Sequence, residues 1–242
     1  LVNNNGTYSL VNAQATIGNV GYATLAEALA AAQAGDVVTI FATTINGNLV
    51  INKSGITVVG ETDANGNNLV TVNGKVSISG SNITVKNINV TNAGSDAMTI
   101  SGGNILVENC NITGYNGLRS CYANNGDVTI KNCVVTGTVY GVHFDAGEGD
   151  GDVIIENSTI TGWTSFGAAV ENVTITGTTF TDGNYNLVRF YQNATVTNCI
   201  FPTANAGNHT SGGMRIDVGN GGAGMAGVTI SFTGCTTADG ES

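Results

Sequence analysis

Short alternations of apolar and polar residues, each closed by an asparagine or a glycine, recur along most of the chain. Alternation with a period of two predicts β-strands that are apolar on one face. Six segments of this kind align with one another and a looser seventh follows; they begin at Ile83, Ile105, Val128, Val153, Val173, Ala194 and Ile230. Self-similarity of this kind predicts a solenoid, in which each repeat forms one coil and stacks on the next.

The residue that closes the first strand of each repeat is always asparagine or glycine. In chain order it is Asn87, Asn109, Asn132, Asn157, Gly177, Asn198 and Gly234. These two residue types enter the left-handed backbone region at the lowest cost, so the position predicts a sharp bend between two strands. Stacked coils would place the asparagine side chains in a ladder, where each can hydrogen-bond to the next coil.

A third alternation completes each repeat. We identify it at Ala97–Ser101, Leu118–Tyr122, Val142–Asp145, Ala168–Glu171, Val188–Tyr191 and Met214–Asp217. Three strands in a rung of about 22 residues predict an all-β fold, a right-handed single-stranded parallel β-helix with three sheets.

Residues 1–35 precede the first rung, and we assign to them a hairpin and a capping helix. Thr24 and Glu27 have the spacing of a capping box, and apolar residues with helical spacing follow up to Gly35. A helix there would cover the open end of the solenoid. We assign residues 36–242 to one β-helix, whose polar last residues are typical of a truncated end.

The repeat VTIKNCVVTG at Val128 and the stretch YATLAEALAAAQAGDVVTIF from Tyr22 resemble the pectin-lyase-like superfamily. The second stretch also resembles the start of many bacterial surface proteins and polysaccharide lyases with this fold. The resemblance covers roughly residues 36–237 and is one of fold, because enzymes and non-enzymes share the pattern. It implies a secreted or cell-surface protein. In characterised enzymes with this fold, the active site lies on the sheet of the third strands.

Charged residues make up only 10% of the chain, and the formal net charge is −10. Nucleic acid is therefore excluded as a partner, since phosphate binding needs clusters of Lys and Arg. No run of 18 apolar residues occurs, so we expect no membrane insertion. In so uncharged a chain, a cluster of charged side chains needs an explanation.

The outward positions of the third strands hold such a cluster. Strand alternation places Arg119, His143, Arg189 and Arg215 in one outward column and Asp145, Glu171, Tyr191 and Asp217 in the next. Arginine can donate paired hydrogen bonds to the carboxylates of acidic sugars, and tyrosine can stack on a sugar ring. We therefore predict that these residues form a carbohydrate-binding surface. A ladder of salt bridges with a purely structural role is the alternative.

A catalytic role would rest on Asp145, Glu171, Arg189 and Arg215. Glycoside hydrolysis needs two carboxylates roughly 5–9.5 Å apart, and Asp145 and Glu171 are predicted on adjacent rungs. Pectate-lyase-like enzymes use an arginine or lysine base beside calcium-binding acids, which Arg189 or Arg215 could imitate. The paired aspartates and the Gly-His-Gly motif of polygalacturonase-like enzymes are absent.

The acidic loop DAGEGDGD offers oxygen ligands for a metal ion. Its carboxylates are Asp145, Glu148, Asp150 and Asp152. Oxygen ligands on a glycine-rich loop suit Ca²⁺, so these four residues are the candidate calcium site. A solvated acidic turn is the alternative.

The five cysteines form an odd set without a CxxC pair, which excludes a zinc ribbon. Cys110, Cys133 and Cys199 share one inward column, where we expect free buried thiols. A disulfide between the first two is the alternative. Cys121 is predicted to face outward.

Two classes of function follow from these features. The first is a non-catalytic module of a larger secreted or cell-surface protein, which binds glycan or serves as an adhesive stalk. The second is a polysaccharide lyase or glycoside hydrolase that acts on acidic polysaccharide. The missing enzyme motifs and the truncated end favour the first class, and the charged strip favours recognition over a spacer role.

Overall fold

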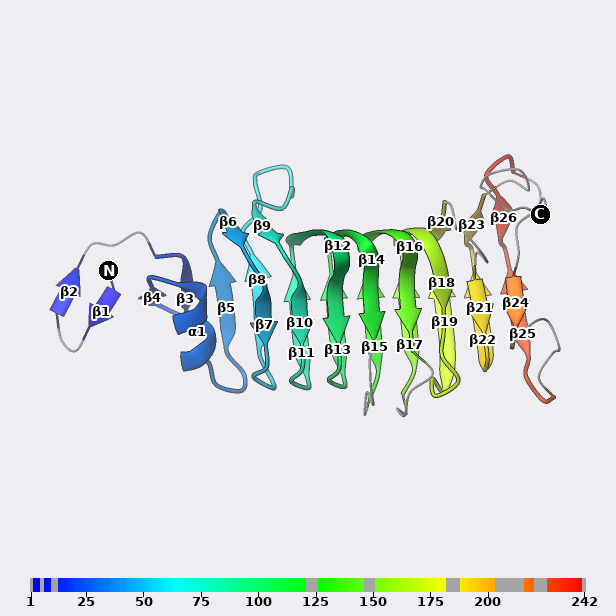
Figure 1. The fold of residues 1–242 in the computed structure, drawn as a ribbon, viewed down its shortest axis with the longest axis horizontal. Helices are drawn as coiled ribbons and strands as arrows, with labels where there is room; N and C mark the ends of the chain where they lie inside the picture. Colours follow the sequence, from blue (N-terminus) through cyan, green and yellow to red (C-terminus); the bar gives the residue numbers. More distant parts are fainter. Residues whose placement is uncertain are drawn as a thin grey trace.

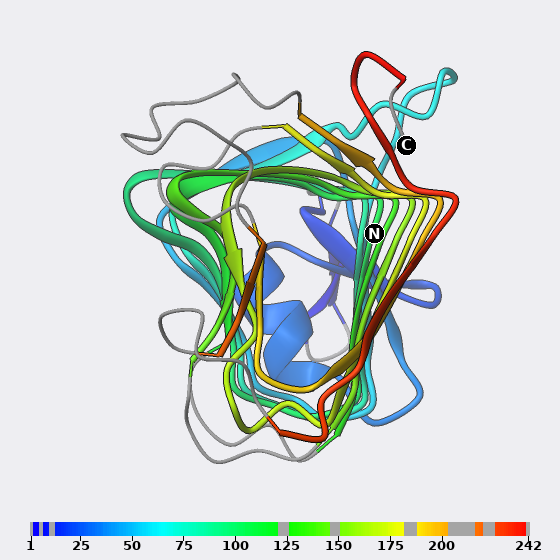
Figure 2. The ribbon, with the colours of Figure 1, turned by 90° about the vertical axis from the view of Figure 1, so that its right-hand side faces the viewer.

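The chain forms an elongated all-β solenoid, in which short strands stack along one axis (Figure 1). The structure, a computed structural model, describes residues 2–4, 7–9, 13–120, 126–145, 151–181, 188–202, 216–219 and 226–240. Seen along the axis, the coils enclose the core with three faces (Figure 2). Successive coils pair in parallel, which confirms the predicted parallel β-helix.

The first face takes one strand from each coil. Its strands are β5 (Val37–Ile40), β8 (Thr57–Gly60), β11 (Ile83–Lys86), β13 (Ile105–Glu108), β15 (Val128–Lys131), β17 (Val153–Glu156), β19 (Asn172–Thr176), β22 (Asn193–Thr197) and β25 (Ile230–Thr233). The repeats are in register, since Ile83 pairs with Ile105, and Ile105 with Val128. All three residues are buried, so the apolar side of the alternation is the side that faces the core.

The second and third faces belong to one hydrogen-bonded sheet. The second face includes β6 (Thr43–Asn46), β9 (Val70–Asn73), β20 (Thr179–Phe180), β23 (Ile200–Phe201) and β26 (Thr236–Thr237). The third face includes β7 (Leu49–Ile51), β10 (Val76–Ile78), β21 (Val188–Phe190) and β24 (Ile216–Val218). Four long strands run through both faces, namely β12 (Ile88–Ile100), β14 (Asn111–Ser120), β16 (Val134–Phe144) and β18 (Thr159–Ser165).

The corner between these two faces is turned by shifts of register within the long strands. One shift between β14 and β16 lies between Gly114 and Asn116. Gly137, at the same corner of β16, has no room for a side chain, because a Cβ there would lie 1.7 Å from the carbonyl oxygen of Tyr140. The three predicted sheets are thus present as three faces, and the long strands join two of these faces into one hydrogen-bonded sheet.

The bend between the first and second faces adopts the left-handed conformation that its residue types predict. The asparagines there have φ values from 48° to 58°; they are Asn87, Asn109, Asn132, Asn157 and Asn198. Gly177 and Gly234 take the same conformation. The Nδ2 group of Asn109 donates a hydrogen bond to Oδ1 of Asn87 at 3.3 Å, which is one step of the expected ladder.

Small polar side chains line the inside of the same bend. The backbone N–H of Cys110 donates to Sγ of Cys133 at 3.5 Å, and the N–H of Cys133 donates to Oγ of Ser158 at 3.1 Å. The N–H of Ser158 in turn donates to Oγ1 of Thr178 at 3.4 Å. Cys110, Cys133 and Cys199 are buried free thiols, as expected, and burial raises the pKa of Cys199 to about 11. Cys121 lies outside the described residues.

Two antiparallel hairpins and a helix precede the first coil. The hairpins are formed by β1 (Val2–Asn4) with β2 (Thr7–Ser9) and by β3 (Ala15–Ile17) with β4 (Val20–Tyr22). Helix α1 (Leu25–Ala31) starts at a capping box, in which Thr24 and Glu27 each accept a hydrogen bond from the other's backbone N–H.

The helix packs against β3, β4 and β5 and buries Leu25, Ala28 and Leu29. It lies at the end of the solenoid (Figure 1), and its role as a cover for the first coil stays a prediction. In the part of the chain that the structure describes, no helix has the length and apolar character needed to cross a membrane.

Candidate functional site

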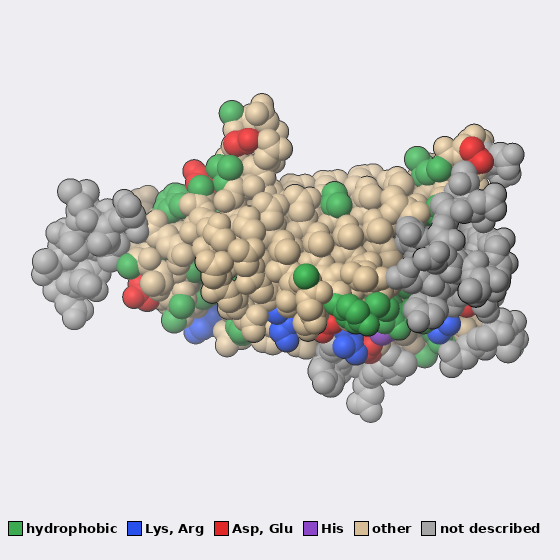
Figure 3. Space-filling model, turned by 45° about the horizontal axis from the view of Figure 1, so that its top comes forward, with side chains coloured by type: hydrophobic (Ala, Val, Ile, Leu, Met, Phe, Trp, Pro, Cys, Tyr) green, Lys and Arg blue, Asp and Glu red, His purple; other side chains and the backbone are tan. Residues whose placement is uncertain are grey.

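Charged and aromatic side chains form a row on the outer side of the third face. We call this row the polar strip; its members are Asp96, Arg119, Tyr140, His143, Asp145, Trp163, Arg189 and Asp217. Leu118, Val142 and Val188 alternate with these residues and are buried, so the strip points away from the core. In Figure 3, basic, acidic and histidine side chains lie beside hydrophobic ones along the lower edge.

Strand pairing sets the order of the strip along the solenoid. Arg119 pairs with His143, and His143 pairs with Ser165 of the next coil. Ser165 pairs with Arg189, which pairs with Asp217. The structure therefore brings Arg119, His143 and Arg189 into one column, as the alternation of the sequence predicts.

Arg119 is held between two carboxylates. Its Nη2 donates a hydrogen bond to Oδ2 of Asp145 at 2.8 Å, and its Nη1 lies 3.8 Å from Oδ2 of Asp96. Asp96 also accepts a hydrogen bond from Nδ2 of Asn116 at 2.7 Å. The Arg119 side chain is 35% exposed, and those of Asp145 and Asp96 are 28% and 16% exposed. The guanidinium is therefore oriented and its charge is already compensated.

His143 sits beside this cluster as a neutral imidazole. Its Nδ1 lies 3.3 Å from Oδ1 of Asp145, without the geometry of a hydrogen bond. Burial lowers the pKa of His143, and the charges of Arg119 and Arg189 act in the same direction, against the opposing effect of Asp145 and Asp96. A lowered pKa keeps the ring uncharged at neutral pH.

Aromatic rings continue the strip from β16 to β21. Tyr140 stacks on His143 with 3.9 Å between the ring centroids, and Trp163 stacks on Tyr140 with 4.7 Å between the centroids. The guanidinium of Arg189 lies over the Trp163 ring, 4.8 Å from its centroid. These contacts use the faces of the rings, so a ligand on the strip would meet mainly their edges and polar atoms.

Arg189 also contacts Asp217, with 3.7 Å between Nη2 and the carboxylate Oδ2. The sequence predicts Arg215 beside Arg189 and Asp217 beside Tyr191. The structure corrects this register by two residues, because Asp217 itself pairs with Arg189. Arg215 lies outside the described residues. The long insertion between β23 and β24 hides the register from sequence reasoning.

Glu171 does not lie on the strip. Ala168–Glu171 was predicted as a strand, but these residues form a turn, and the third face of this coil is made by Thr164–Ser165 at the end of β18. Glu171 is exposed, and its N–H donates to the carbonyl of Gly151 at 3.0 Å, near the first face. Asp145 and Glu171 are therefore not brought together as a carboxylate pair on the third face.

Three members of the strip were not predicted from the sequence. Tyr140, Trp163 and Asp96 lie at the corner where the register shifts, so simple alternation does not assign them to a face. Gly137, three residues before Tyr140, and Gly162, directly before Trp163, are the sequence signal that could have marked this corner. Tyr191 is half-buried two residues beyond Arg189.

The predicted calcium site falls only partly on described residues. Asp145 binds Arg119, and Oδ1 of Asp152 accepts a hydrogen bond from Nδ2 of Asn172 at 2.9 Å. Glu148 and Asp150 lie outside the described residues. Among the residues that the structure describes, no group of three or more His, Cys, Asp or Glu side chains is arranged to hold a metal ion. Calcium binding by this loop stays a prediction.

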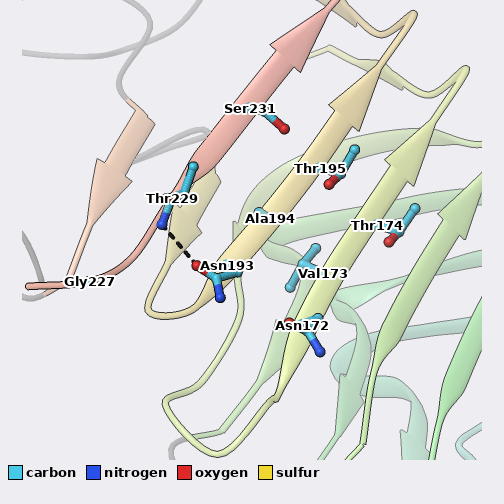
Figure 4. A pocket seen from close by; sticks show the side chains of 9 residues that line it. All are labelled: Asn172, Val173, Thr174, Asn193, Ala194, Thr195, Gly227, Thr229 and Ser231. Atoms are coloured by element: carbon cyan, nitrogen blue, oxygen red, sulfur yellow. Dashed lines mark hydrogen bonds between the residues drawn. The ribbon is translucent and has the colours of Figure 1, made fainter.

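A shallow depression of about 510 Å³ lies on the first face near its C-terminal end (Figure 4). Its side chains are neutral, and its polar ones are amides and hydroxyls; they are Asn172, Thr174, Asn193, Thr195, Thr229 and Ser231. Oδ1 of Asn193 accepts a hydrogen bond from the N–H of Thr229 at 2.9 Å. This bond ties the two coils together, and the depression lacks the charged and aromatic groups of the strip.

Comparison with known proteins identifies the fold. A family model described as a right-handed beta helix region matches residues 74–236. No curated protein matches the chain in sequence.

Several solved structures share the architecture. Escherichia coli YbhC matches with a TM-score of 0.62 and 11% identity, over 91% of this chain and 83% of that one. A pectin methylesterase variant in complex with a hexasaccharide matches with a TM-score of 0.56 and 15% identity, over 88% and 90% of the two chains. A pectate lyase matches with a TM-score of 0.53 and 15% identity, over 92% and 74%. Identities this low show a common fold and leave function to be argued from the site.

Proposed function

The chain belongs to the family of right-handed β-helix regions, and from this premise we propose that it is a non-catalytic module that binds glycan through the polar strip. The observation that carries the proposal is the continuous row of ion-paired and stacked side chains on one outer face. Only 10% of the residues are charged, yet five ionic groups lie in this row beside two aromatic side chains and a histidine.

Pre-organisation of these groups favours binding. Arg119 is fixed by two carboxylates, and Arg189 is fixed between Trp163 and Asp217. Because these side chains are already ordered, little conformational entropy is lost when a ligand hydrogen-bonds to them. That loss is otherwise a major cost of association. Guanidinium, carboxylate and phenol groups together supply both donors and acceptors for sugar hydroxyls.

The charge balance of the strip favours a neutral glycan over an acidic one. Three carboxylates and two guanidinium groups leave the described part of the strip with a net charge of minus one. The whole chain carries a net charge of −10, so a polyanionic polysaccharide would be repelled on approach. The acidic-sugar interpretation of the arginines is weakened, because both described guanidinium groups already have acidic partners.

Catalysis on acidic polysaccharide is the second candidate. It is supported by the cluster of Asp145, His143 and Arg119 on the third face, and two of the similar structures are a pectin methylesterase and a pectate lyase. We rank it second because Asp145 is engaged by Arg119 and because Glu171, its expected partner, lies elsewhere. Membership of a larger secreted or cell-surface protein is part of the first proposal and rests on the same likeness of fold.

A polysaccharide screen with two readouts tests the proposal. The purified chain is incubated with neutral and acidic polysaccharides, with and without Ca²⁺, and both binding and the release of reducing or unsaturated ends are measured. We expect binding of a neutral polysaccharide without product. Arg189→Ala should weaken binding about tenfold or more, as for a central contact residue.

Lys131→Ala is the matched control, because it removes a cation from an ion pair on the first face, where Nζ lies 3.0 Å from Glu156. It should bind like the parent chain. Product formation that disappears in Asp145→Asn would make the protein an enzyme and overturn the proposal.

A further inference from the structure

A recess lies away from the polar strip, at the corner between the first and second faces. It has a volume of about 450 Å³ and is lined by six asparagines, which define the amide groove: Asn67, Asn68, Asn89, Asn109, Asn111 and Asn132. Two of them lie in the loop before β9, which projects from the solenoid (Figures 1 and 2). The surface beside this loop is almost wholly uncharged in Figure 3.

The projecting loop forms a pre-organised outer wall. Oδ1 of Asp63 accepts hydrogen bonds from the N–H groups of Asn65 and Asn67, both at 2.8 Å, and its Oδ2 accepts from Nδ2 of Asn67 at 2.8 Å. The side chain and the backbone of Asn67 thereby hold the pKa of Asp63 below its usual value. Since the loop closes on itself through these bonds, a ligand need not order it.

A chain of amide contacts fixes the inner wall. Nδ2 of Asn68 donates to the carbonyl oxygen of Asn109 at 2.8 Å, and Nδ2 of Asn89 donates to the carbonyl oxygen of Asn68 at 3.0 Å. Nδ2 of Asn111 donates to Oδ1 of Asn89 at 2.8 Å. A carboxamide has two N–H donors and an acceptor, so Asn111 retains hydrogen-bonding capacity. Asn109, Asn111 and Asn132 are exposed.

We propose that the amide groove is a binding site for a neutral saccharide, separate from the polar strip. Its lining offers donors and acceptors but no formal charge, which suits a polar, uncharged ligand. Neighbouring hydroxyl groups of a sugar can pair with the donor and acceptor of one carboxamide. A peptide added as a strand is disfavoured, because β9, β12 and β14 are each paired on both sides.

Two substitutions remove amide side chains from the groove and introduce residues that are compatible with the backbone conformation at each position. Asn111→Thr suits its strand position, because the register places Val134 and then Thr159 there in the next coils. Asn132→Gly preserves the left-handed bend, where φ is 52°, since glycine adopts it freely. Asn198→Gly is the matched control, with the same change at a bend outside the groove, where φ is 54°.

The experiment titrates the ¹⁵N-labelled chain with neutral hexasaccharides of glucose, mannose and galactose. Side-chain amide resonances report the site, and calorimetry reports the affinity. An Arg189→Ala background weakens binding to the strip, and the Asn111 and Asn132 resonances report the groove alone, so the two proposals can fail independently. We expect one hexasaccharide to shift the resonances of Asn111 and Asn132. The double variant should bind about tenfold more weakly, because two hydrogen-bonding side chains are lost, whereas Asn198→Gly should bind like the parent.

The proposal is overturned if none of the three hexasaccharides shifts these resonances, or if the double variant binds as tightly as the parent. Saturable binding of an uncharged extended peptide, such as a glutamine-rich decamer, with no response to the saccharides would also overturn it.

Discussion

At the scale of the residue, the left-handed bend constrains each coil most tightly. Asn157 has a φ of 48°, a conformation that costs a residue with a Cβ roughly 1–2 kcal/mol, less for asparagine. Asn157→Ala should therefore lower the free energy of unfolding by up to about that amount, while Asn157→Gly, which adopts the bend freely, should lower it by less. Urea unfolding of the two variants measures the difference. Equal losses would mean that the bend conformation is not the source of the constraint.

His143 makes stability depend on pH. Its pKa is lowered in the folded chain from the ordinary value of 6.5, so the unfolded chain binds a proton more readily. The stability linked to the neutral ring is fully present above pH 6.5 and is lost as the pH falls from there through the folded pKa. The urea midpoint should therefore decrease as the pH falls below about 6.5, above the range where most carboxylates titrate.

Two variants separate this effect from other titrations. His143→Gln should reduce the decrease, and Lys131→Ala, which removes a charge from the first face, should leave it unchanged. An undiminished decrease in His143→Gln would contradict the assignment.

At the scale of the element, the first two strands of each coil and the bend between them follow directly from the sequence. Each is a single unbroken alternation with its bend residue at one place, as β13, Asn109 and the start of β14 illustrate. The third-face strands are harder to predict because the register shifts at the corner alter the phase of the alternation. The third face of this coil is accordingly made by Thr164–Ser165 and not by the predicted segment Ala168–Glu171.

The register shifts at the corner also explain why only part of the strip could be predicted from the sequence. Arg119, His143 and Arg189 follow regular pairing after the corner and were placed correctly in one column. Asp217 was misplaced because a long insertion separates it from the preceding coil. Tyr140 was missed because it lies within the corner, between two register shifts. There, the alternation of residues along the strand does not show which side chains face outward.

Gly137 allows the corner of β16 to form, and its replacement should disturb the strip. A Cβ at Gly137 would lie 1.7 Å from the carbonyl oxygen of Tyr140, so Gly137→Ala forces the backbone apart. We expect a loss of about 1–3 kcal/mol in the free energy of unfolding, as for other overpacked sites. Because Trp163 is the chain's single tryptophan and stacks on Tyr140, its fluorescence spectrum should change as well.

Gly94→Ala is the control for this prediction, because a Cβ at Gly94 meets no atom within 4 Å. It should change neither stability nor fluorescence appreciably. A folded Gly137→Ala variant with the parent spectrum would show that Trp163 does not depend on the corner.

At the scale of the whole molecule, the net charge of −10 distinguishes the two classes of ligand. Binding of a neutral glycan involves no long-range attraction, so its affinity should change less than about twofold between about 20 mM and about 300 mM NaCl. Binding of an acidic polysaccharide to local cations would instead depend strongly on salt. Calorimetric titration at several salt concentrations measures this dependence, and a steep change of affinity for the bound glycan would contradict a neutral ligand.

The most direct measurement of the central claim is a fluorescence titration of Trp163 with the neutral polysaccharide that the screen identifies. Trp163 lies between Tyr140 and Arg189 in the strip, so occupancy of the strip should change its emission in a saturable way. The account predicts such a change in the parent chain and in Lys131→Ala, and a titration shifted about tenfold or more to higher glycan concentration in Arg189→Ala. Saturable binding that leaves the emission of Trp163 unchanged, with equal affinity in Arg189→Ala, would contradict it.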